Sequence, residues 1–288
     1  LQPMEWTEDG WPVIGEDKDG DGVGEPVRKY RKPDLASSGV FQPAESDEFK
    51  GNELGLQWQW HGVPSPYWYY TAPGKLRLYS VDQAEGWKNL GDTPNLLLQK
   101  TPADRFTATA KVRFVPNPQL KEKGESCGLV LMGQDYAALK MTDTKDGVML
   151  QYIECKNALK GSEERVLCEI PLASEPLPTP YSNIYMSTSV PPVAPISYEG
   201  AEAYLRLKVM PRERKGDVPE LTATFWYSQD GKKWTQLTPS GSLSGRSDYV
   251  FTGRPGKWIG AKFGFFCNRL ASKNDSGWME IDWIKVTD

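Results

Sequence analysis

The feature that most constrains the fold of this chain is a long succession of short segments in which apolar and polar residues alternate. From residue 46 to residue 288 these segments follow one another, separated by turns rich in glycine and proline. In FTATAKVRF every second residue from Phe106 to Phe114 is apolar, so one face of an extended strand is apolar. A dozen or more such segments predict an all-β chain with two packed antiparallel sheets, a jelly-roll β-sandwich.

Extended segments account for most of this region, and helical periodicity is weak throughout. The segments that predict strands are GLQWQWHG, YWYYT, GKLRLYS, NLLLQK, FTATAKVRFVP, CGLVLMG, YAALKMT, GVMLQYIEC, RVLCEI, AYLRLKVMP, LTATFWYSQDGKKWTQL, WIGAKFGFFC and WMEIDWIKVT. Asp230-Gly231 predicts a hairpin turn, because glycine accepts the positive φ that such a turn requires. Residues 171–200 contain many prolines and predict a long surface excursion in place of strands.

The first residues, LQPMEWTEDGWPVIG, predict a separate β-hairpin. Asp9-Gly10 lies between two short apolar runs, which is the pattern of a tight turn between paired strands. A two-stranded hairpin is marginally stable in water, so we expect this piece to belong to a larger assembly of strands. We therefore predict a hairpin piece at 1–33, a linker at 34–45 and a sandwich at 46–288.

Charge and motif content exclude several classes of function. The net charge of −4 argues against a nucleic-acid partner, which requires a concentrated basic surface. No apolar run approaches the roughly 20 residues of a membrane helix, so no membrane partner is expected. The P-loop, Rossmann and GxSxG signatures are missing, and the single histidine, His61, excludes His-rich metal sites.

The four cysteines lie in apolar, strand-like segments and match no metal-binding spacing. They are Cys127, Cys155, Cys168 and Cys267. We interpret them as buried free thiols, which behave as small apolar side chains. A disulfide between Cys155 and Cys168 is the alternative.

The aromatic run WQWHGVPSPYWYY is the most informative stretch for binding. Trp58 and Trp60 are two residues apart and would share one face of a strand, and Trp68 follows after a proline-containing turn. Flat aromatic faces suit the apolar faces of sugar rings. Trp58, Trp60, Trp68 and the neighbouring His61 are therefore candidate carbohydrate-binding residues. The alternative is that these side chains fill the core or edge of a large sandwich.

Two acidic features predict cation sites, and calcium is an ion that prefers carboxylate oxygens. Asp17, Asp19 and Asp21 alternate in DKDGDG like the first half of a calcium loop. That loop lacks the bidentate Glu at its twelfth position, so a solvated acidic turn is the alternative. Asp47 opens the predicted sandwich and Asp282 lies in its last strand. Where terminal strands pair, such residues can meet, and Asp47 and Asp282 are our candidate ligands of a structural Ca²⁺.

Many of these segments resemble one known family. LQPMEW, DGWPVIG and DGDGVGEPVRKYRKP resemble the end of the five-bladed propeller of family 43 glycoside hydrolases, the β-xylosidases and α-L-arabinofuranosidases. The segments that resemble their C-terminal concanavalin-like sandwich are SDEF, LGLQWQWHGVP, GKLRLYS, NLLLQKTPADRFTATAKVRF, CGLVLMGQDYAALK, YSQDGKKW, WIGAKFGFFC and IDWIKV. The resemblance implies that 1–33 is the terminal segment of a propeller blade and 46–288 an accessory sandwich.

The resemblance also implies a division of labour. In that family, three acidic residues on earlier blades perform inverting hydrolysis; none of those motifs occurs here, so no catalytic residue is carried over. The sandwich packs on the propeller and in some members lends an aromatic residue to the rim of the active-site pocket. By alignment with WIGAKFGFF this residue would be Phe263, Phe265 or Phe266, and Phe265 is our candidate. The implied partners are xylan or arabinoxylan oligosaccharides and the N-terminal propeller portion of the same enzyme, as a separate or cleaved chain. The location stays open, with an extracellular or periplasmic one favoured.

Three functions are compatible with these features, and we favour the first. It is the C-terminal half of a xylan-directed glycoside hydrolase, whose sandwich supports the catalytic propeller and shapes its substrate pocket. The second is an autonomous xylan- or arabinoxylan-binding module without catalysis. The third is an independent enzyme with a jelly-roll active site, for which Glu280 and Asp282 in MEIDW offer a carboxylate pair.

Overall fold

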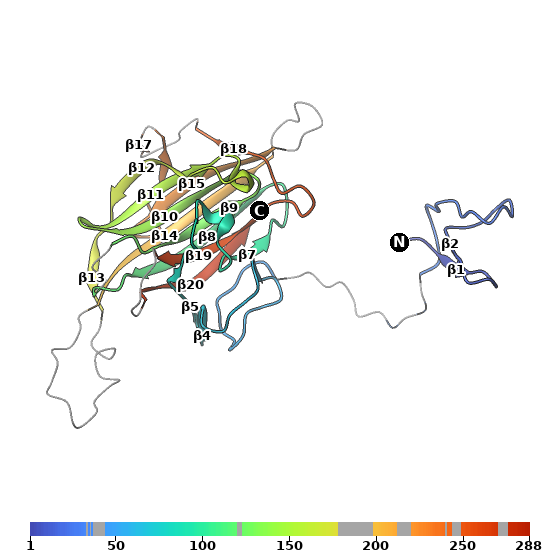
Figure 1. Cartoon of the computed structure of the whole chain (residues 1–288), viewed down its shortest axis with the longest axis horizontal. Coiled ribbons are helices and arrows are strands. Elements are labelled where there is room, and N and C mark those ends of the chain that lie inside the picture. The colour runs from blue at the N-terminus through green and yellow to red at the C-terminus, as the bar shows by residue number, and fades with distance from the viewer. Residues whose placement is uncertain are drawn as a thin grey trace, which may run out of the picture. The chain divides into compact units, whose positions relative to one another are not determined.

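The computed structural model divides the chain into two compact units, Leu1–Gln42 and Pro43–Asp288 (Figure 1). The residues that the structure describes are 1–32, 34, 36, 44–119, 123–177, 198–211, 220–239, 241–243, 249–269 and 276–288. The division falls inside the predicted linker at 34–45, and most of that linker lies outside the described residues. Each unit is described by itself below.

The first unit contains the predicted hairpin. Strand β1 (Met4–Trp6) pairs antiparallel with β2 (Pro12–Ile14). In the turn, the amide of Gly10 donates to the carbonyl of Thr7 at 3.0 Å, and Gly10 has a φ of +85°, which glycine adopts at little steric cost. The side chains of Trp6 and Trp11 are both more than half exposed. The hairpin is therefore confirmed, and its origin in a propeller blade stays a prediction.

The second unit is a sandwich of two sheets. The larger is a ten-stranded sheet with the order β17-β16-β15-β14-β8-β20-β5-β4, to which β13 and β18 add at β14 and β15. Its strands are β4 (Tyr69–Ala72), β5 (Lys75–Tyr79), β8 (Phe106–Val115), β13 (Ser174–Pro176), β14 (Glu199–Met210), β15 (Leu221–Ser228), β16 (Thr235–Thr238), β17 (Gly241–Leu243), β18 (Phe251–Gly253) and β20 (Trp278–Thr287).

The smaller sheet has eight strands in the order β12-β11-β10-β9-β19-β7-β3, with β6 beside β19. Its strands are β3 (Gln59–Trp60), β6 (Val81–Asp82), β7 (Leu97–Lys100), β9 (Ser126–Met132), β10 (Tyr136–Thr144), β11 (Gly147–Cys155), β12 (Arg165–Pro171) and β19 (Lys262–Arg269). Within the described residues, β6 and β19 form the single parallel pair. Antiparallel pairing elsewhere confirms the predicted sandwich.

Alternation along the strands builds the core between the two sheets. Phe106, Ala108, Ala110, Val112 and Phe114 of β8 are all at most 1% exposed and belong to one apolar cluster, as the sequence pattern predicted. Each buried Phe or Val contributes roughly 1.5–3 kcal/mol to folding. A second, smaller cluster, which includes Leu90, Tyr136 and Phe266, lies apart from this core.

Several local predictions need refinement. Four short strands were not predicted, namely β6, β13, β17 and β18. The Pro-rich stretch 171–200 contributes strand residues at both of its ends, and its residues 178–197 lie outside the described part of the chain. Two 3₁₀ turns, Leu90–Asp92 and Ala158–Lys160, are the helical elements among the described residues, and none is long or apolar enough to cross a lipid bilayer.

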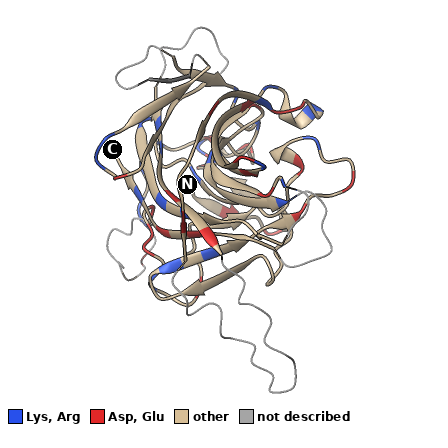
Figure 2. Ribbon diagram, turned by 90° about the vertical axis from the view of Figure 1, so that its left-hand side faces the viewer, with Lys and Arg blue, Asp and Glu red and all other residues tan. Residues whose placement is uncertain are grey.

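The cysteines are free thiols, as interpreted from the sequence, although Cys168 is half-buried and not buried. The alternative disulfide is not formed, because the register of β11 and β12 places Cys168 opposite Tyr152 and away from Cys155. Charged residues of both signs are interspersed over the strands and loops (Figure 2).

Candidate functional site

The predicted carbohydrate-binding residues Trp58 and Phe265 lie in the core. Trp58 is 8% exposed and packs between Phe49 and Phe265, with ring centroids 6.0 and 5.9 Å away; Phe265 is 0% exposed. The indole Nε1 of Trp58 donates to Oδ2 of Asp47 at 2.8 Å, which satisfies its buried polar atom. A ring enclosed on both faces cannot stack on a sugar. The prediction for these two residues is corrected: their role is packing.

Trp60 and Trp68 do come together at the surface. Their ring centroids are 5.3 Å apart in an edge-to-face arrangement, and Tyr69 lies 5.4 Å from Trp60. All three rings are half-buried, and the neighbouring Tyr67 and Tyr70 are 85% and 58% exposed. Trp68 and Tyr67 line an open cavity of about 430 Å³. This aromatic corner, residues 60–70, is the part of the predicted site that can reach a sugar.

His61 is held beside this corner by backbone contacts. Its amide donates to the carbonyl of Leu96 at 2.9 Å, and its Nε2 lies 3.3 Å from the carbonyl oxygen of Gly91. The side chain is exposed. Among the described residues, the hydrogen-bond partner of the imidazole is the Gly91 carbonyl, which does not supply the carboxylate and hydroxyl of a catalytic triad; its contact with a carbohydrate stays a prediction.

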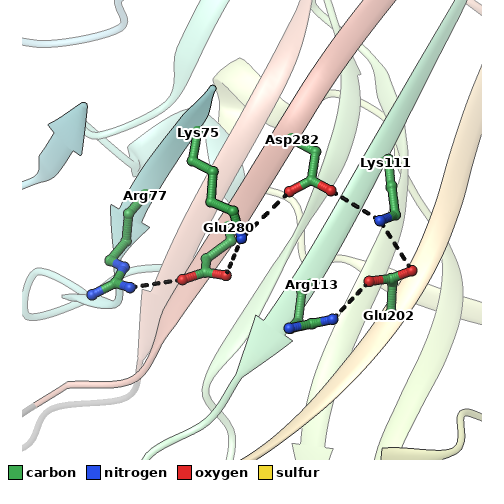
Figure 3. A network of polar contacts seen from close by, with 7 residues as sticks. All are labelled: Lys75, Arg77, Lys111, Arg113, Glu202, Glu280 and Asp282. Carbon is green, nitrogen blue, oxygen red and sulfur yellow. Dashed lines mark hydrogen bonds and ion pairs between the residues drawn. The ribbon is translucent and has the colours of Figure 1, made fainter. Parts of the chain in front are cut away.

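Asp47 and Asp282 do not meet at a calcium site. The first and last segments of the sandwich pair as expected: the amide of Asp47 donates to the carbonyl of Ile284 at 2.9 Å, and the reverse bond is 2.8 Å. Asp47 thus shares the face of Ile284, which is in the core, and its carboxylate accepts from Trp58 and from the amide of Phe49. The Asp282 carboxylate instead contacts Lys111 at 2.9 Å (Figure 3). The pair does not fit a shared metal ion.

Glu280 and Asp282 do not form a catalytic pair either. The Glu280 side chain is 6% exposed, and its carboxylate contacts Arg77 at 2.7 Å and Lys75 at 3.4 Å (Figure 3). Burial opposes its ionisation, but the hydrogen bond and charge of Arg77 and Lys75 outweigh burial and lower its pKa below the usual value. A general acid for glycoside hydrolysis needs a raised pKa. The third predicted function therefore lacks its acid.

Asp17, Asp19 and Asp21 are brought together in the first unit. One carboxylate oxygen from each lies within 4.8 Å of the other two, and all three side chains are exposed. The Asp17 oxygens accept from the amides of Gly20 at 2.7 Å and Gly22 at 2.9 Å, and these two bonds lower the pKa of Asp17. Both interpretations, a cation loop and a solvated acidic turn, remain compatible with this geometry.

Trp258 is a candidate that the sequence analysis missed. In PGKWIG the amide of Gly256 donates to the carbonyl of Gly260 at 3.1 Å and closes a tight loop, with Gly260 at a φ of +71°. Trp258 at the tip is 95% exposed and Ile259 is 60% exposed. Two apolar residues between turn glycines were the available signal, because turns are usually polar. Phe263, Phe265 and Phe266 of the same stretch are 0% exposed, so none of them can be the predicted rim residue.

The base of the Trp258 loop is fixed by an ion pair. Asp135, at the start of β10, accepts from the Nε of Arg254 at 2.8 Å and from its Nη2 at 2.6 Å. Asp135 also accepts from the amide of Asn157 at 2.7 Å, and Gln134 donates to the carbonyl of Pro255 at 2.9 Å. The hydrogen bonds from Arg254 hold the pKa of Asp135 well below its usual range. The exposed tryptophan is therefore presented on a firmly anchored loop.

A model of one protein family, described as the beta xylosidase C-terminal concanavalin A-like domain, matches residues 46–287. The matched span begins where the sandwich was predicted to begin, and it covers most of the chain.

Individual relatives extend this match. The chain is 27% identical, over an alignment of 294 residues, to a beta-xylosidase from Formosa agariphila, covering 99% of this chain and 41% of that protein. It is 33% identical over 137 residues to a non-reducing end alpha-L-arabinofuranosidase from Bacteroides ovatus, and this alignment covers 47% of this chain and 23% of that protein. The crystal structure of a xylan beta-1,4-xylosidase from Bacillus halodurans shares the fold, with a TM-score of 0.59, 21% identity and coverage of 100% and 46%. The chain spans less than half the length of each of these proteins.

Proposed function

The chain belongs to the family of beta-xylosidase C-terminal concanavalin A-like domains, and from this premise we propose that it is the C-terminal part of a xylan-directed glycoside hydrolase. In this proposal the sandwich supports a catalytic propeller and shapes its substrate pocket. The names of two relatives, a beta-xylosidase and an alpha-L-arabinofuranosidase, support pentose glycosides of xylan or arabinoxylan as substrates. The greater length of both relatives supports a catalytic portion beyond the matched region.

The observation that carries the pocket-shaping role is the exposure of Trp258. A side chain that is 95% exposed on an anchored loop gains nothing from the core of the sandwich. Exposed apolar side chains that lie together mark surfaces that contact a partner or a ligand, and the exposed Ile259 directly follows Trp258. We assign Trp258, with Ile259 beside it, to the rim of the propeller pocket, in place of Phe265.

Hydrolysis itself is assigned to the propeller portion. Among the described residues of the sandwich, the one carboxylate pair suggested by the sequence, Glu280 and Asp282, is neutralised by basic residues. No residue of this chain is therefore proposed as catalytic.

The test is a reconstitution with aryl xylosides and aryl arabinofuranosides. Residues 1–288 are assayed alone and then with the catalytic propeller portion, supplied as a separate chain or joined ahead of residue 1. We expect no hydrolysis by the chain alone and hydrolysis by the combination. Trp258→Ala should lower kcat/KM by about tenfold, equivalent to about 1.4 kcal/mol, because an aromatic contact at the rim is lost. Unchanged kcat/KM in Trp258→Ala, with the fold intact, would remove the pocket-shaping role.

The aromatic corner supports a second candidate, an autonomous xylan-binding module. Trp68 and Tyr67 line the open cavity, and the exposed Tyr70 lies in β4, which begins directly after Trp68. The test is retention in a native gel that contains arabinoxylan. This role is favoured if the wild type and Trp258→Ala are retained and Trp68→Ala is not. Equal mobility with and without the polysaccharide would reject it.

A further inference from the structure

The outer face of the ten-stranded sheet carries polar and aromatic side chains in register. Arg206 on β14 lies directly opposite Trp226 on β15 and Thr109 on β8, and Thr109 lies opposite Lys285 on β20. Residues directly opposite one another point to the same side of a sheet. These side chains therefore form one row that crosses four strands.

At one end of this face each of four basic side chains contacts a carboxylate (Figure 3). The basic residues there are Lys75, Arg77, Lys111 and Arg113, and the acidic residues that pair with them are Glu202, Glu280 and Asp282. The distances range from 2.7 Å for Arg77 to Glu280 to 3.8 Å for Lys75 to Asp282. Four cations share three carboxylates at this end, and each cation has a carboxylate partner within 3.4 Å.

The other end holds two cations, Arg206 and Lys208, to which the described part of the chain supplies no carboxylate. The guanidinium carbon of Arg206 lies 3.4 Å from the ring centroid of Trp234, and its Nε donates to the hydroxyl of Thr109 at 2.8 Å. The Nζ of Lys208 lies 4.9 Å from the ring centroid of Trp226. Among the residues that the structure describes, no carboxylate pairs with Arg206 or Lys208.

Holding these two charges together has an energetic cost. Both side chains are half-buried; burial lowers the pKa of Arg206, and burial together with the nearby charge of Arg206 lowers the pKa of Lys208. Desolvated cations are stabilised by an anion that supplies hydrogen-bond acceptors, and a carboxylate matches the planar fork of a guanidinium. The acidic residue in the adjacent turn, Asp230, is engaged by Ser228 and by the amides of Lys232 and Lys233.

We propose that Arg206, Lys208, Trp226 and Trp234, here called the Arg206 surface, bind an acidic glycan whose sugar units carry carboxylates. The two cations would receive the carboxylate, while the half-buried indole rings offer stacking contacts to a sugar; the buried hydroxyl of Thr109 holds the Arg206 side chain in place. The choice of a sugar over another anion rests on the proposed function; the preference for a negative charge rests on the unpaired cations alone. This surface is distinct from the aromatic corner and from Trp258.

The test compares two ligands that differ only in charge. Residues 1–288 are run in native gels containing xylan substituted with glucuronic acid, or the same xylan with those carboxyl groups reduced to primary alcohols. We expect tighter retention by the acidic xylan and weaker retention at high salt. The double variant Arg206→Gln/Lys208→Gln should bind the acidic xylan at least about tenfold more weakly and the neutral xylan unchanged. Arg206→Lys keeps the charge but loses the planar fork of the guanidinium, so its affinity for the acidic xylan should lie between those of the wild type and the double variant.

A matched control separates local from overall charge. Lys145→Gln/Lys160→Gln changes the net charge by the same amount at exposed positions beyond the ends of β10 and β11, and it should bind like the wild type. Thermal unfolding confirms that each variant is folded.

Equal retention by both xylans, or equal loss in both double variants, overturns the proposal. So does dextran sulfate or DNA binding as tightly as the acidic xylan, because the surface would then be a general polyanion site. Retention is measured without hydrolysis and with Trp258 intact, so failure here is distinguishable from failure of the pocket-shaping role.

Discussion

Two tryptophans of the sandwich have opposite environments. Trp58, in LQWQW, is 8% exposed, and Trp258, in PGKWIG, is 95% exposed. Trp58 is drawn inward by Asp47, which accepts its indole hydrogen, and by ring contacts with Phe49 and Phe265. Trp258 is held outward because its loop is closed at Gly256 and Gly260 and anchored through Arg254. The comparison teaches that the burial of a tryptophan depends on the contacts available to its segment: the partners of Trp58 lie elsewhere in the sequence, whereas Trp258 is kept in solvent by the turn residues around it.

The largest expected difference between the two regions is in the free energy of unfolding. Trp58→Ala should lower it by about 3–5 kcal/mol, because the substitution leaves a cavity between Phe49 and Phe265. The same change at Trp258 should alter it by less than about 0.5 kcal/mol, since the ring is in solvent. Urea unfolding followed by circular dichroism measures both. Similar losses in the two variants would remove the distinction.

A smaller effect is expected at the anchor of the Trp258 loop. Asp135→Ala removes the acceptor of the Arg254 side chain and of the Asn157 amide. A fully buried pair broken in this way costs about 3–5 kcal/mol, and because the Arg254 side chain is 40% exposed we expect about 2 kcal/mol. Asp146→Ala, in an exposed turn, is the control and should cost less than about 0.5 kcal/mol. Urea midpoints that shift equally in both variants would show that the anchor contributes nothing.

The same anchor predicts a dependence of stability on pH. The pKa of Asp135 is depressed in the folded protein, chiefly by hydrogen bonds from Arg254, so its contribution is complete above the unfolded value of about 3.9 and is lost as the pH falls below it. From about pH 5 to about pH 2, the free energy of unfolding should therefore decrease more in the wild type than in Asp135→Ala. If the free energy of unfolding fell equally with pH in the wild type and in Asp135→Ala, the depressed pKa of Asp135 would be contradicted.

The sequence was sufficient for the strands because alternation reports burial directly. The thirteen predicted strand segments, FTATAKVRFVP among them, each contain a strand of the structure. The short strands β6 and β18 escaped prediction because two or three residues cannot display a period of two. The hairpin at Asp9-Gly10 was predictable because its turn chemistry is local.

The candidate site was less predictable because it depends on which face of a strand meets which layer. Alternation put Trp58 and Trp60 on one face, and both pack on the same core, but Trp58 is 8% exposed whereas Trp60 is half-buried. At the other terminus, a bulge between Ile281 and Trp283 shifts the phase of β20, which places Asp282 outward while Ile284 points inward. Neither the depth to which Trp58 is buried nor the bulge in β20 leaves a signal in the local sequence. Trp258 did leave one, as an apolar residue in a glycine turn.

The smallest expected effect concerns calcium at the Trp58 region. The Asp47 oxygens already accept from Phe49, Gln57 and Trp58, at 2.8, 3.1 and 2.8 Å, and Asp282 is paired with Lys111. A metal ion would have to displace these donors, so neither chelation by EDTA nor added Ca²⁺ should move the unfolding temperature of the sandwich by more than about 1 °C. Asp47→Ala should lower the free energy of unfolding by about 1–3 kcal/mol, because it strands the buried indole donor, and this loss should be the same with and without EDTA. The opposite outcome is that EDTA lowers the unfolding temperature of the wild type, that added Ca²⁺ restores this temperature, and that Asp47→Ala no longer responds to EDTA. That outcome would place a calcium ion at Asp47.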